Sequence, residues 1–343
     1  MKKFLHKYNF GLEGGGSLPQ VEVAYHTIGR LSPQRDNVVW VCHALTADSR
    51  VDQWWDGLFG TERLFDSEKY FIVCANVIGS CYGSTSPLSV DPRTGRPYYH
   101  DFPLITIRDI VHAHQLLADH LGIGQIHLLI GGSMGGFQAM EWAIEQPERI
   151  ERLVLLATAA RHSAWGIAFN ESQRMSIEAD YTWLWKDDKA GWIGLRAARA
   201  IALLSYRHYN AYVATQTDED AKLFDYRASS YQRYQGKKLT DRFNAHAYYV
   251  LTRSMDSHHV GRNRLSTEHS LGMIRAETFV IGIDSDLLFP PSEQEFLAEH
   301  IPGAKLSILA SPFGHDGFLV ETDQINHAIL NAFETEKVKN NTR

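Results

Sequence analysis

Short, continuously apolar runs recur along much of the chain, and amphipathic stretches separate them. Because their apolar character does not alternate, we predict strands that are buried on both faces of a parallel sheet covered by helices. By contrast, residues 21–26 alternate apolar and polar side chains, which predicts a half-exposed antiparallel strand at the sheet edge. The predicted buried strands are Val38–Cys42, Tyr70–Cys74, Ile126–Ile130, Leu153–Leu156, Thr278–Ile281 and Lys305–Leu309.

Helical spacing follows several of these runs. A capping-box pattern at Thr106 and Asp109 predicts the start of a helix that ends at Gly122. A second predicted helix covers residues 135–146 and is stopped by Pro147. Two more are predicted near the C-terminus, at residues 293–300 and 323–334.

The strand pattern stops between Ala157 and Thr278. The intervening residues are rich in Tyr, Trp, Arg and Ala and contain no clear buried strand. We therefore predict an α/β core formed by residues 1–157 and 278–343, with a mostly parallel, doubly wound sheet. Residues 158–277 are predicted to form a helical cap inserted into that core.

Charge and composition exclude several classes of protein. The net charge is −6 over 343 residues and there is no basic stripe, so we expect no nucleic-acid partner. No apolar segment approaches the roughly 18 residues needed to span a bilayer, and the N-terminus lacks a signal-peptide pattern. Three cysteines do not form a disulfide framework. We therefore expect a cytoplasmic protein without membrane contact.

The most informative motif is Gly131-Gly132-Ser133-Met134-Gly135, which lies between a predicted strand and a predicted helix. Strand, G-x-S-x-G turn and helix together predict a nucleophile elbow. The serine of such an elbow has a strained backbone, and small neighbours let the strand and the helix pass close to each other. Ser133 is therefore the predicted nucleophile.

A serine nucleophile needs a base, and the base needs an acid to orient it. With an elbow of this kind the chain order is serine, acid, histidine, and the last two follow late strands. His315, in a glycine-flanked loop after the last predicted strand, is the predicted base. Asp284 and Asp286 compete for the role of the acid; we favour Asp286, because the apolar residues 287–290 that follow can shield its carboxylate from water.

The same motif predicts an oxyanion hole. One donor is the backbone N–H of Met134, the residue after the nucleophile, and the other comes from the loop after an earlier strand. Residues 41–46 occupy that position, and we assign the second donor to Leu45. His43, in the same loop, is predicted to be structural.

Seventeen histidines raise the alternative of a metal centre. His112 and His114 are two apart on a predicted helix, and His258 and His259 are adjacent, so the members of each pair point in different directions. No H-E-x-x-H or C-x-x-C motif is present. We expect no metal and no permanently bound cofactor.

Several further blocks make the chain resemble the homoserine O-acetyltransferases of the α/β-hydrolase superfamily. The resemblance extends from about Tyr25 to Val320 and includes the elbow and the Asp286 and His315 segments. Its most specific blocks are His43–Thr46, Asn76–Thr85, Asp91–Tyr98, Asp101–Asp109 and Asn170–Arg174.

This resemblance implies Ser133, Asp286 and His315 as the catalytic triad. It also implies Arg199, Tyr206 and Asp316 as residues that bind the acceptor. The implied reaction is ping-pong transfer of an acetyl group from acetyl-CoA to L-homoserine, in methionine biosynthesis. Together with the apolar composition of the cap, the resemblance implies a homodimer formed through the cap.

Three alternatives remain open at this stage. An esterase or thioesterase would use the same triad but release the acyl group to water. A binding or scaffold protein on the same fold would be expected to lack a triad residue. Succinyl-CoA as donor or L-serine as acceptor would require the same chemistry, and one methylene changes acceptor preference by only about 1–3 kcal/mol.

Overall fold

The computed structural model describes the backbone of residues 1–340 and the side chains of residues 1–333. Its centre is an eight-stranded sheet with the strand order β1-β4-β6-β5-β9-β10-β11-β12. The pairs β1–β4 and β4–β6 are antiparallel, and the remaining pairs are parallel. The strands are β1 Lys2–His6, β4 Val21–Ile28, β5 Val38–Cys42, β6 Phe71–Ala75, β9 Ile126–Gly132, β10 Ile150–Leu156, β11 Glu277–Ile283 and β12 Lys305–Leu309.

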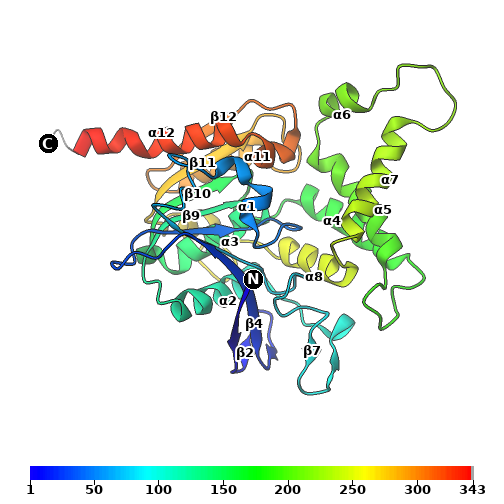
Figure 1. Cartoon of the computed structure of the whole chain (residues 1–343), viewed down its shortest axis with the longest axis horizontal. Coiled ribbons are helices and arrows are strands. Elements are labelled where there is room, and N and C mark those ends of the chain that lie inside the picture. The colour runs from blue at the N-terminus through cyan, green and yellow to red at the C-terminus, as the bar shows by residue number, and fades with distance from the viewer. Residues whose placement is uncertain (341–343) are drawn as a thin grey trace.

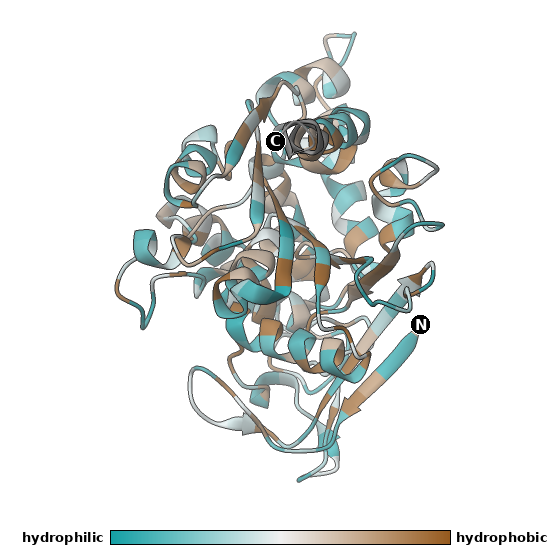
Figure 2. Ribbon diagram, turned by 90° about the vertical axis from the view of Figure 1, so that its left-hand side faces the viewer, coloured by the Kyte–Doolittle hydropathy of each residue, from teal (hydrophilic) through white to brown (hydrophobic). Residues whose placement is uncertain are grey.

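Each of the six predicted runs forms one of the parallel strands, but the prediction of burial is wrong for β12, which is outermost in the sheet and has Leu306 and Ile308 exposed at 38% and 37%. Successive side chains of a strand point to opposite faces, so a run that is apolar throughout has a core on each side. Trp40 packs in the core under α2 (Ile107–His120), α3 (Met134–Glu145) and α10 (Pro291–His300), whereas Val41 packs in the core under α1 (Val51–Trp54) and α12 (Thr322–Asn340). Figure 2 shows this apolar character on the strands at the centre of the molecule. The predicted α/β class, with a mostly parallel sheet, is confirmed.

The prediction of an edge strand at residues 21–26 is also wrong in part. The segment of residues 21–26 is antiparallel as predicted, but it is not the edge strand, because β1 pairs along its outer side. The sequence of β1 contains two lysines and a histidine and too few apolar residues to be recognised as a strand. Charged residues on an outermost strand are nevertheless typical, because they oppose pairing with another chain.

Helices cover both faces of the sheet (Figure 1). The predicted capping box exists: the Thr106 side chain accepts from the Asp109 N–H, and the Asp109 carboxylate accepts from the Thr106 N–H. The core helices are α1 Val51–Trp54, α2 Ile107–His120, α3 Met134–Glu145, α10 Pro291–His300, α11 Gly317–Val320 and α12 Thr322–Asn340. Two small hairpins (β2 Phe10–Gly11 with β3 Ser17–Leu18, β7 Val90–Asp91 with β8 Arg96–Pro97) and four 3₁₀ turns (Asp56–Leu58, Tyr99–Asp101, Pro147–Arg149, Gly314–Asp316) complete the core.

Between β10 and β11 the chain is helical. In Figure 1 helices α4–α7 lie to one side of the sheet, and α5 packs between α4 and α7. The helices of this segment are α4 Ala164–Glu178, α5 Trp192–Tyr206, α6 Tyr209–Gln216, α7 Arg227–Thr240, α8 Ala245–Asp256 and α9 Thr267–Leu271. We call residues 158–277 the cap.

Candidate active site

Ser133 lies between the end of β9 and the start of α3. Its backbone has φ 56° and ψ −126°, a conformation that is strained for a residue with a side chain. Glycine is required on both sides for close packing. A Cβ atom at Gly131 would collide with the carbonyl of Gly135, and one at Gly135 would collide with the carbonyl of Cys42. The elbow geometry thus follows directly from the G-x-S-x-G spacing.

The structure brings the three predicted triad side chains into one hydrogen-bonded chain. His315 Nε2 lies 2.9 Å from Ser133 Oγ, and His315 Nδ1 lies 2.7 Å from Asp286 Oδ2. All three residues are buried, with exposed fractions of 6%, 3% and 2% for Ser133, His315 and Asp286. A carboxylate at Nδ1 fixes the proton on that nitrogen, so that Nε2 is free to accept the serine proton.

The two competing aspartates have different partners. Asp286 Oδ1 accepts hydrogen bonds from the backbone N–H groups of Leu288 (2.8 Å) and Phe289 (2.9 Å) while its Oδ2 contacts His315. Asp284 Oδ1 instead accepts from the Ser311 N–H (2.9 Å), which ties the loops after β11 and β12 together. The carboxylate that orients the histidine is therefore that of Asp286.

Aromatic rings enclose the imidazole of His315. The ring centres of Phe318, Phe289 and Tyr206 lie 5.1, 5.2 and 5.8 Å from that of His315. The predicted shielding by residues 287–290 is correct for Leu288 and Phe289, which are buried, but Leu287 is 50% exposed. Excluding water in this way strengthens the interaction between the carboxylate and the imidazole.

The loop after β5 packs against the start of α3, where an oxyanion hole would form. Gln138 Nε2 donates to the carbonyls of His43 and Met134, each at 3.1 Å, and so joins the two segments. Met134 is the first residue of α3, a position whose N–H has no partner within the helix. The Leu45 N–H makes no hydrogen bond with any other residue that the structure describes.

Both ring nitrogens of His43 have backbone partners. Nε2 accepts from the Val77 N–H (3.0 Å), and Nδ1 lies 2.8 Å from the Ala44 carbonyl. Burial lowers the pKa of the imidazole, which favours this neutral form. His43 therefore stabilises its loop and has no free nitrogen that could act as a base.

The residues implied to bind the acceptor lie beside the triad. The guanidinium carbon of Arg199 lies 5.4 Å from the ring centre of Tyr206, whose ring faces His315. Burial raises the pKa of the Tyr206 phenol, and the Arg199 charge opposes that rise. Asp316, next to the base, forms an ion pair with Arg207, whose Nε lies 3.1 Å from Asp316 Oδ2.

Arg207 contacts Asp316 beside the triad, and sequence reasoning missed it. Its partner is 109 positions further along the chain, and no local pattern links the two. The contact depends on Gly314, which has φ +65° and lets the turn that contains His315 approach the backbone of residues 206–208. A side chain there would come within 2.8 Å of the His208 nitrogen.

The histidines considered as metal ligands are apart from this site. His114 is fully buried beside Trp40 and Trp142, and burial lowers its pKa to about 3. His258 stacks on Phe137, with ring centres 3.9 Å apart. Among the described residues, no group of three or more His, Cys, Asp or Glu side chains is arranged to hold a metal ion.

Comparisons with known proteins agree with this fold. The sequence profile of the alpha/beta hydrolase fold matches residues 37–322, which places the chain in that class of protein. The homoserine O-acetyltransferase of Cyclobacterium marinum is 46% identical over 325 residues, covering 95% of this chain and 92% of that protein. The chain thus belongs to the homoserine O-acetyltransferase family of enzymes.

Solved structures show how widely the fold is used. The homoserine O-acetyltransferase from Bacillus anthracis superposes with a TM-score of 0.88 at 22% identity, covering 96% of this chain and 95% of that one. An acetylester hydrolase from Corynebacterium glutamicum gives 0.85 at 23% identity, covering 97% and 95%. The fold alone therefore does not distinguish acyl transfer from hydrolysis.

The described residues include no helix that is both long and apolar enough to cross a membrane.

Proposed function

We propose that the protein transfers an acetyl group from acetyl-CoA to the hydroxyl of L-homoserine through an acyl-enzyme on Ser133. The observation that carries the proposal is the buried Ser133–His315–Asp286 chain of hydrogen bonds in a sequence 46% identical to a homoserine O-acetyltransferase. A serine activated in this way is suited to acyl transfer from an activated ester.

In the first half-reaction, His315 Nε2 removes the proton from Ser133 Oγ as that oxygen attacks the thioester carbon. The negative charge that develops on the thioester oxygen is stabilised by the backbone N–H groups of Leu45 and Met134. When the carbon–sulfur bond breaks, the protonated His315 returns its proton to the departing CoA sulfur. The product of this half-reaction is acetylated Ser133.

In the second half-reaction, the acceptor hydroxyl replaces the thioester as the partner of His315. His315 Nε2 takes the hydroxyl proton while the oxygen attacks the acetyl carbon, and the same N–H groups stabilise the oxyanion. Collapse of this intermediate breaks the bond to Ser133 Oγ, which regains its proton from His315. Asp286 holds the imidazole in the required tautomer throughout.

Homoserine is a zwitterion, and the site offers complementary charges beside the base. We assign Asp316 to its ammonium group and Arg199 to its carboxylate, with Tyr206 lining the space between Arg199 and His315. Two charged contacts would orient the acceptor hydroxyl toward the acyl-enzyme. A hydrolase has no need of such a pair, so these residues favour transfer over release to water.

The direct test measures thiol release from acetyl-CoA by the purified protein, with and without L-homoserine. Release that depends on homoserine, with O-acetylhomoserine identified by mass spectrometry, would support the proposal, and Ser133→Ala would abolish it. Thiol release at the same rate with and without L-homoserine would mean that water is the nucleophile and that the protein is a hydrolase. Parallel assays with succinyl-CoA and L-serine test the donor and the acceptor separately.

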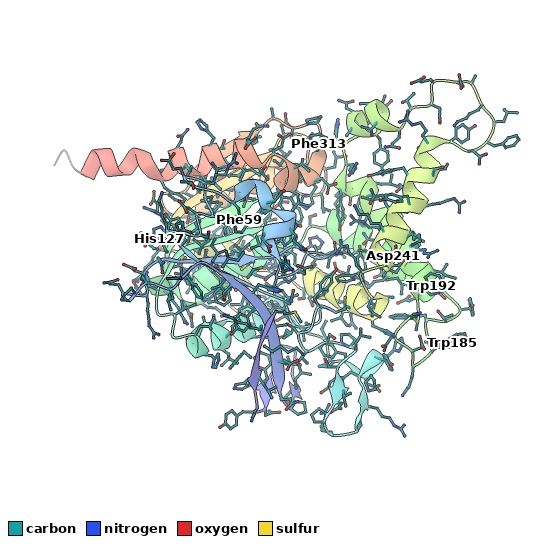
Figure 3. The ribbon with its side chains drawn as sticks, in the orientation of Figure 1. Phe59, His127, Trp185, Trp192, Asp241 and Phe313 are labelled. Atoms are coloured by element: carbon teal, nitrogen blue, oxygen red, sulfur yellow. The ribbon has the colours of Figure 1, made fainter. Side chains whose placement is uncertain are left out.

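We further propose that this reaction serves methionine biosynthesis in the cytoplasm and that two copies of the chain associate through the cap. The cap exposes several large apolar side chains, among them Met175, Tyr181, Leu184 and Trp185. Trp185 and Trp192 lie on the side of the cap that faces away from the sheet (Figure 3). An apolar surface of this kind is typical of a protein–protein contact.

A further inference from the structure

Arg207 joins the cap to the turn that contains the catalytic histidine. Its Nε donates to Asp316 Oδ2 at 3.1 Å, and its guanidinium carbon lies 5.3 Å from the ring centre of Tyr231 on α7. Both members of this ion pair have hydrogen-bonding atoms that the pair does not use. Within the described part of the chain, neither Asp316 Oδ1 nor the two terminal nitrogens of Arg207 have a hydrogen-bond partner.

Two tyrosine hydroxyls beside this ion pair also lack partners. The rings of Tyr212 on α6 and Tyr231 on α7 meet edge to face, with centres 6.0 Å apart. Both hydroxyl oxygens are buried, and neither makes a hydrogen bond with a described residue. Gln235, one turn further along α7, approaches Tyr231 without forming one. Buried phenols of this kind normally have a partner, so two together indicate a missing ligand group.

The charges of Arg199 and Arg207 affect the pKa of both phenols. Burial raises the pKa of Tyr212 and of Tyr231, the Asp316 carboxylate adds to the rise, and the charges of Arg207 and Arg199 oppose it in each case. Both guanidinium groups are therefore within electrostatic reach of both hydroxyls. Two guanidinium groups and two phenols offer hydrogen-bond donors that suit an anion, and a carboxylate accepts up to four such bonds.

We propose that Arg199, Arg207, Tyr212 and Tyr231 together form the subsite for the acceptor's carboxylate, and that Arg207 also positions Asp316. Arg207 fixes one carboxylate oxygen of Asp316 and leaves the other for the acceptor's ammonium group. This inference rests on the proposed function, because it takes the acceptor to be an amino acid. It extends the acceptor site from α5 to α6 and α7.

The arrangement matches the charge pattern of an amino acid. An acceptor of this class carries its ammonium and carboxylate groups on one carbon, so the two charges are only a few bonds apart. Asp316 and Arg207 form a neighbouring pair of opposite charges, each with a free hydrogen-bonding atom. When the acceptor binds beside this ion pair, its ammonium group would contact Asp316 and its carboxylate would contact Arg207. An acceptor without a carboxylate would give Arg199, the terminal nitrogens of Arg207 and the two phenols no anion to bind.

The test combines hydroxyl removal in the protein with carboxylate removal in the acceptor. Tyr212→Phe and Tyr231→Phe retain the rings and lose only the hydroxyls. 3-Aminopropan-1-ol is homoserine without its carboxylate. For each variant we expect kcat/KM for L-homoserine to fall about 10-fold. With 3-aminopropan-1-ol, which gives the hydroxyls no anion to bind, we expect little change. Arg207→Gln should lower the value for homoserine about 100-fold, and more than for the amino alcohol.

Two controls isolate the effect. Tyr234→Phe and Arg233→Gln change exposed residues on the same helix, α7, and should behave like the wild type with both acceptors. The first-turnover release of CoA without any acceptor should also match the wild type in both control variants, which change only exposed side chains of α7.

The outcomes separate this inference from the proposed function. Equal losses with both acceptors in an enzyme whose wild type acetylates homoserine would give the tyrosines a structural role and overturn the inference alone. A wild-type protein that forms no O-acetylhomoserine would overturn the proposed function, and the subsite with it. A loss confined to the acceptor with a carboxylate would support both.

Discussion

At the scale of single residues, two carboxylates in one loop have different partners although they are only two positions apart. Asp286 is bonded to His315 and to two backbone N–H groups of its own turn, whereas Asp284 is bonded to Ser311 in the neighbouring loop. The sequence limited the acid to these two residues. It did not decide between them, because the choice depends on where the loop after β12 places His315.

Replacing Asp286 tests this assignment. Asp286→Asn would keep the shape of the side chain but could hold the imidazole in the wrong tautomer, so we expect kcat to fall about 10⁴-fold. The measurement is steady-state acetyl transfer to L-homoserine. Asp284→Asn is the matched control and should retain most of the activity, because an amide oxygen can still accept from the Ser311 N–H. A similar loss in both variants would contradict the assignment.

A second residue-scale prediction concerns acid stability and His114. Burial lowers the pKa of His114 to about 3 from an ordinary 6.5, and neither ring nitrogen has a hydrogen-bond partner among the described residues. As the pH falls below 6.5 the unfolded chain binds a proton there that the folded chain does not, so stability falls with pH.

The effect can be measured with His114→Leu, which removes the titrating group. Between pH 7 and pH 5 we expect the wild type to lose about 2 kcal/mol more of its free energy of unfolding than this variant. Urea unfolding at the two pH values provides the comparison. His120→Leu, on the same helix but exposed, should retain the acid sensitivity of the wild type. If His114→Leu showed the same pH dependence as the wild type, His114 would not be a cause of the loss of stability in acid.

At the scale of elements, local patterns predicted most of the sheet and the elbow. The apolar runs predicted the parallel strands, and the G-x-S-x-G spacing predicted the sharp turn between β9 and α3, because both depend on neighbouring residues alone. The outermost strand, β1, was missed. Its five residues gain their structure from pairing with β4 and not from an apolar pattern of their own.

The contact between the turn that contains His315 and residues 206–208 of the cap depends on Gly314, and a substitution there tests it. Gly314→Ala would force a strained φ and would also push the turn of His315 away from residues 206–208. We expect at least a 10-fold loss of kcat in addition to lower stability, since misplacing a catalytic group by about 1 Å can cost about 100-fold. The measurements are acetyl transfer and urea unfolding.

Gly303→Ala is the matched control for that experiment. Gly303 has a similar φ of +69°, but no atom lies within 4 Å of the position of an added Cβ. The variant should lose about 1 kcal/mol of stability from the backbone strain alone and should keep its kcat. If Gly303→Ala and Gly314→Ala behaved alike, the contact with residues 206–208 would have no part in placing His315.

At the scale of the whole molecule, the cap differs from the α/β core in its apolar side chains. Several large ones are exposed on the cap, whereas most of those in the core are buried. Leu184 is 83% exposed and Trp185 is 54% exposed. If these residues belong to the proposed dimer contact, Leu184→Asp combined with Trp185→Asp should give a monomer of 38.9 kDa where the wild type has twice that mass. Light scattering coupled to size-exclusion chromatography measures both masses.

The control for that prediction lies outside the cap. Val90 is also exposed, at 56%, in the small hairpin of β7 and β8, and Val90→Asp should leave the dimer intact. A wild-type protein that elutes as a monomer at micromolar concentration would contradict the proposed association through the cap.

The sequence by itself determined the class of fold, the nucleophile elbow and the short list of groups that could serve it. Those features depend on backbone conformation, which nearby residues encode through apolar spacing and glycine. Tertiary structure alone decided which aspartate orients His315, that Arg207 pairs with Asp316, and that Tyr231 lies beside Arg207 and packs against Tyr212. These contacts join segments far apart in the chain, and a side chain's partner is set by how such segments pack.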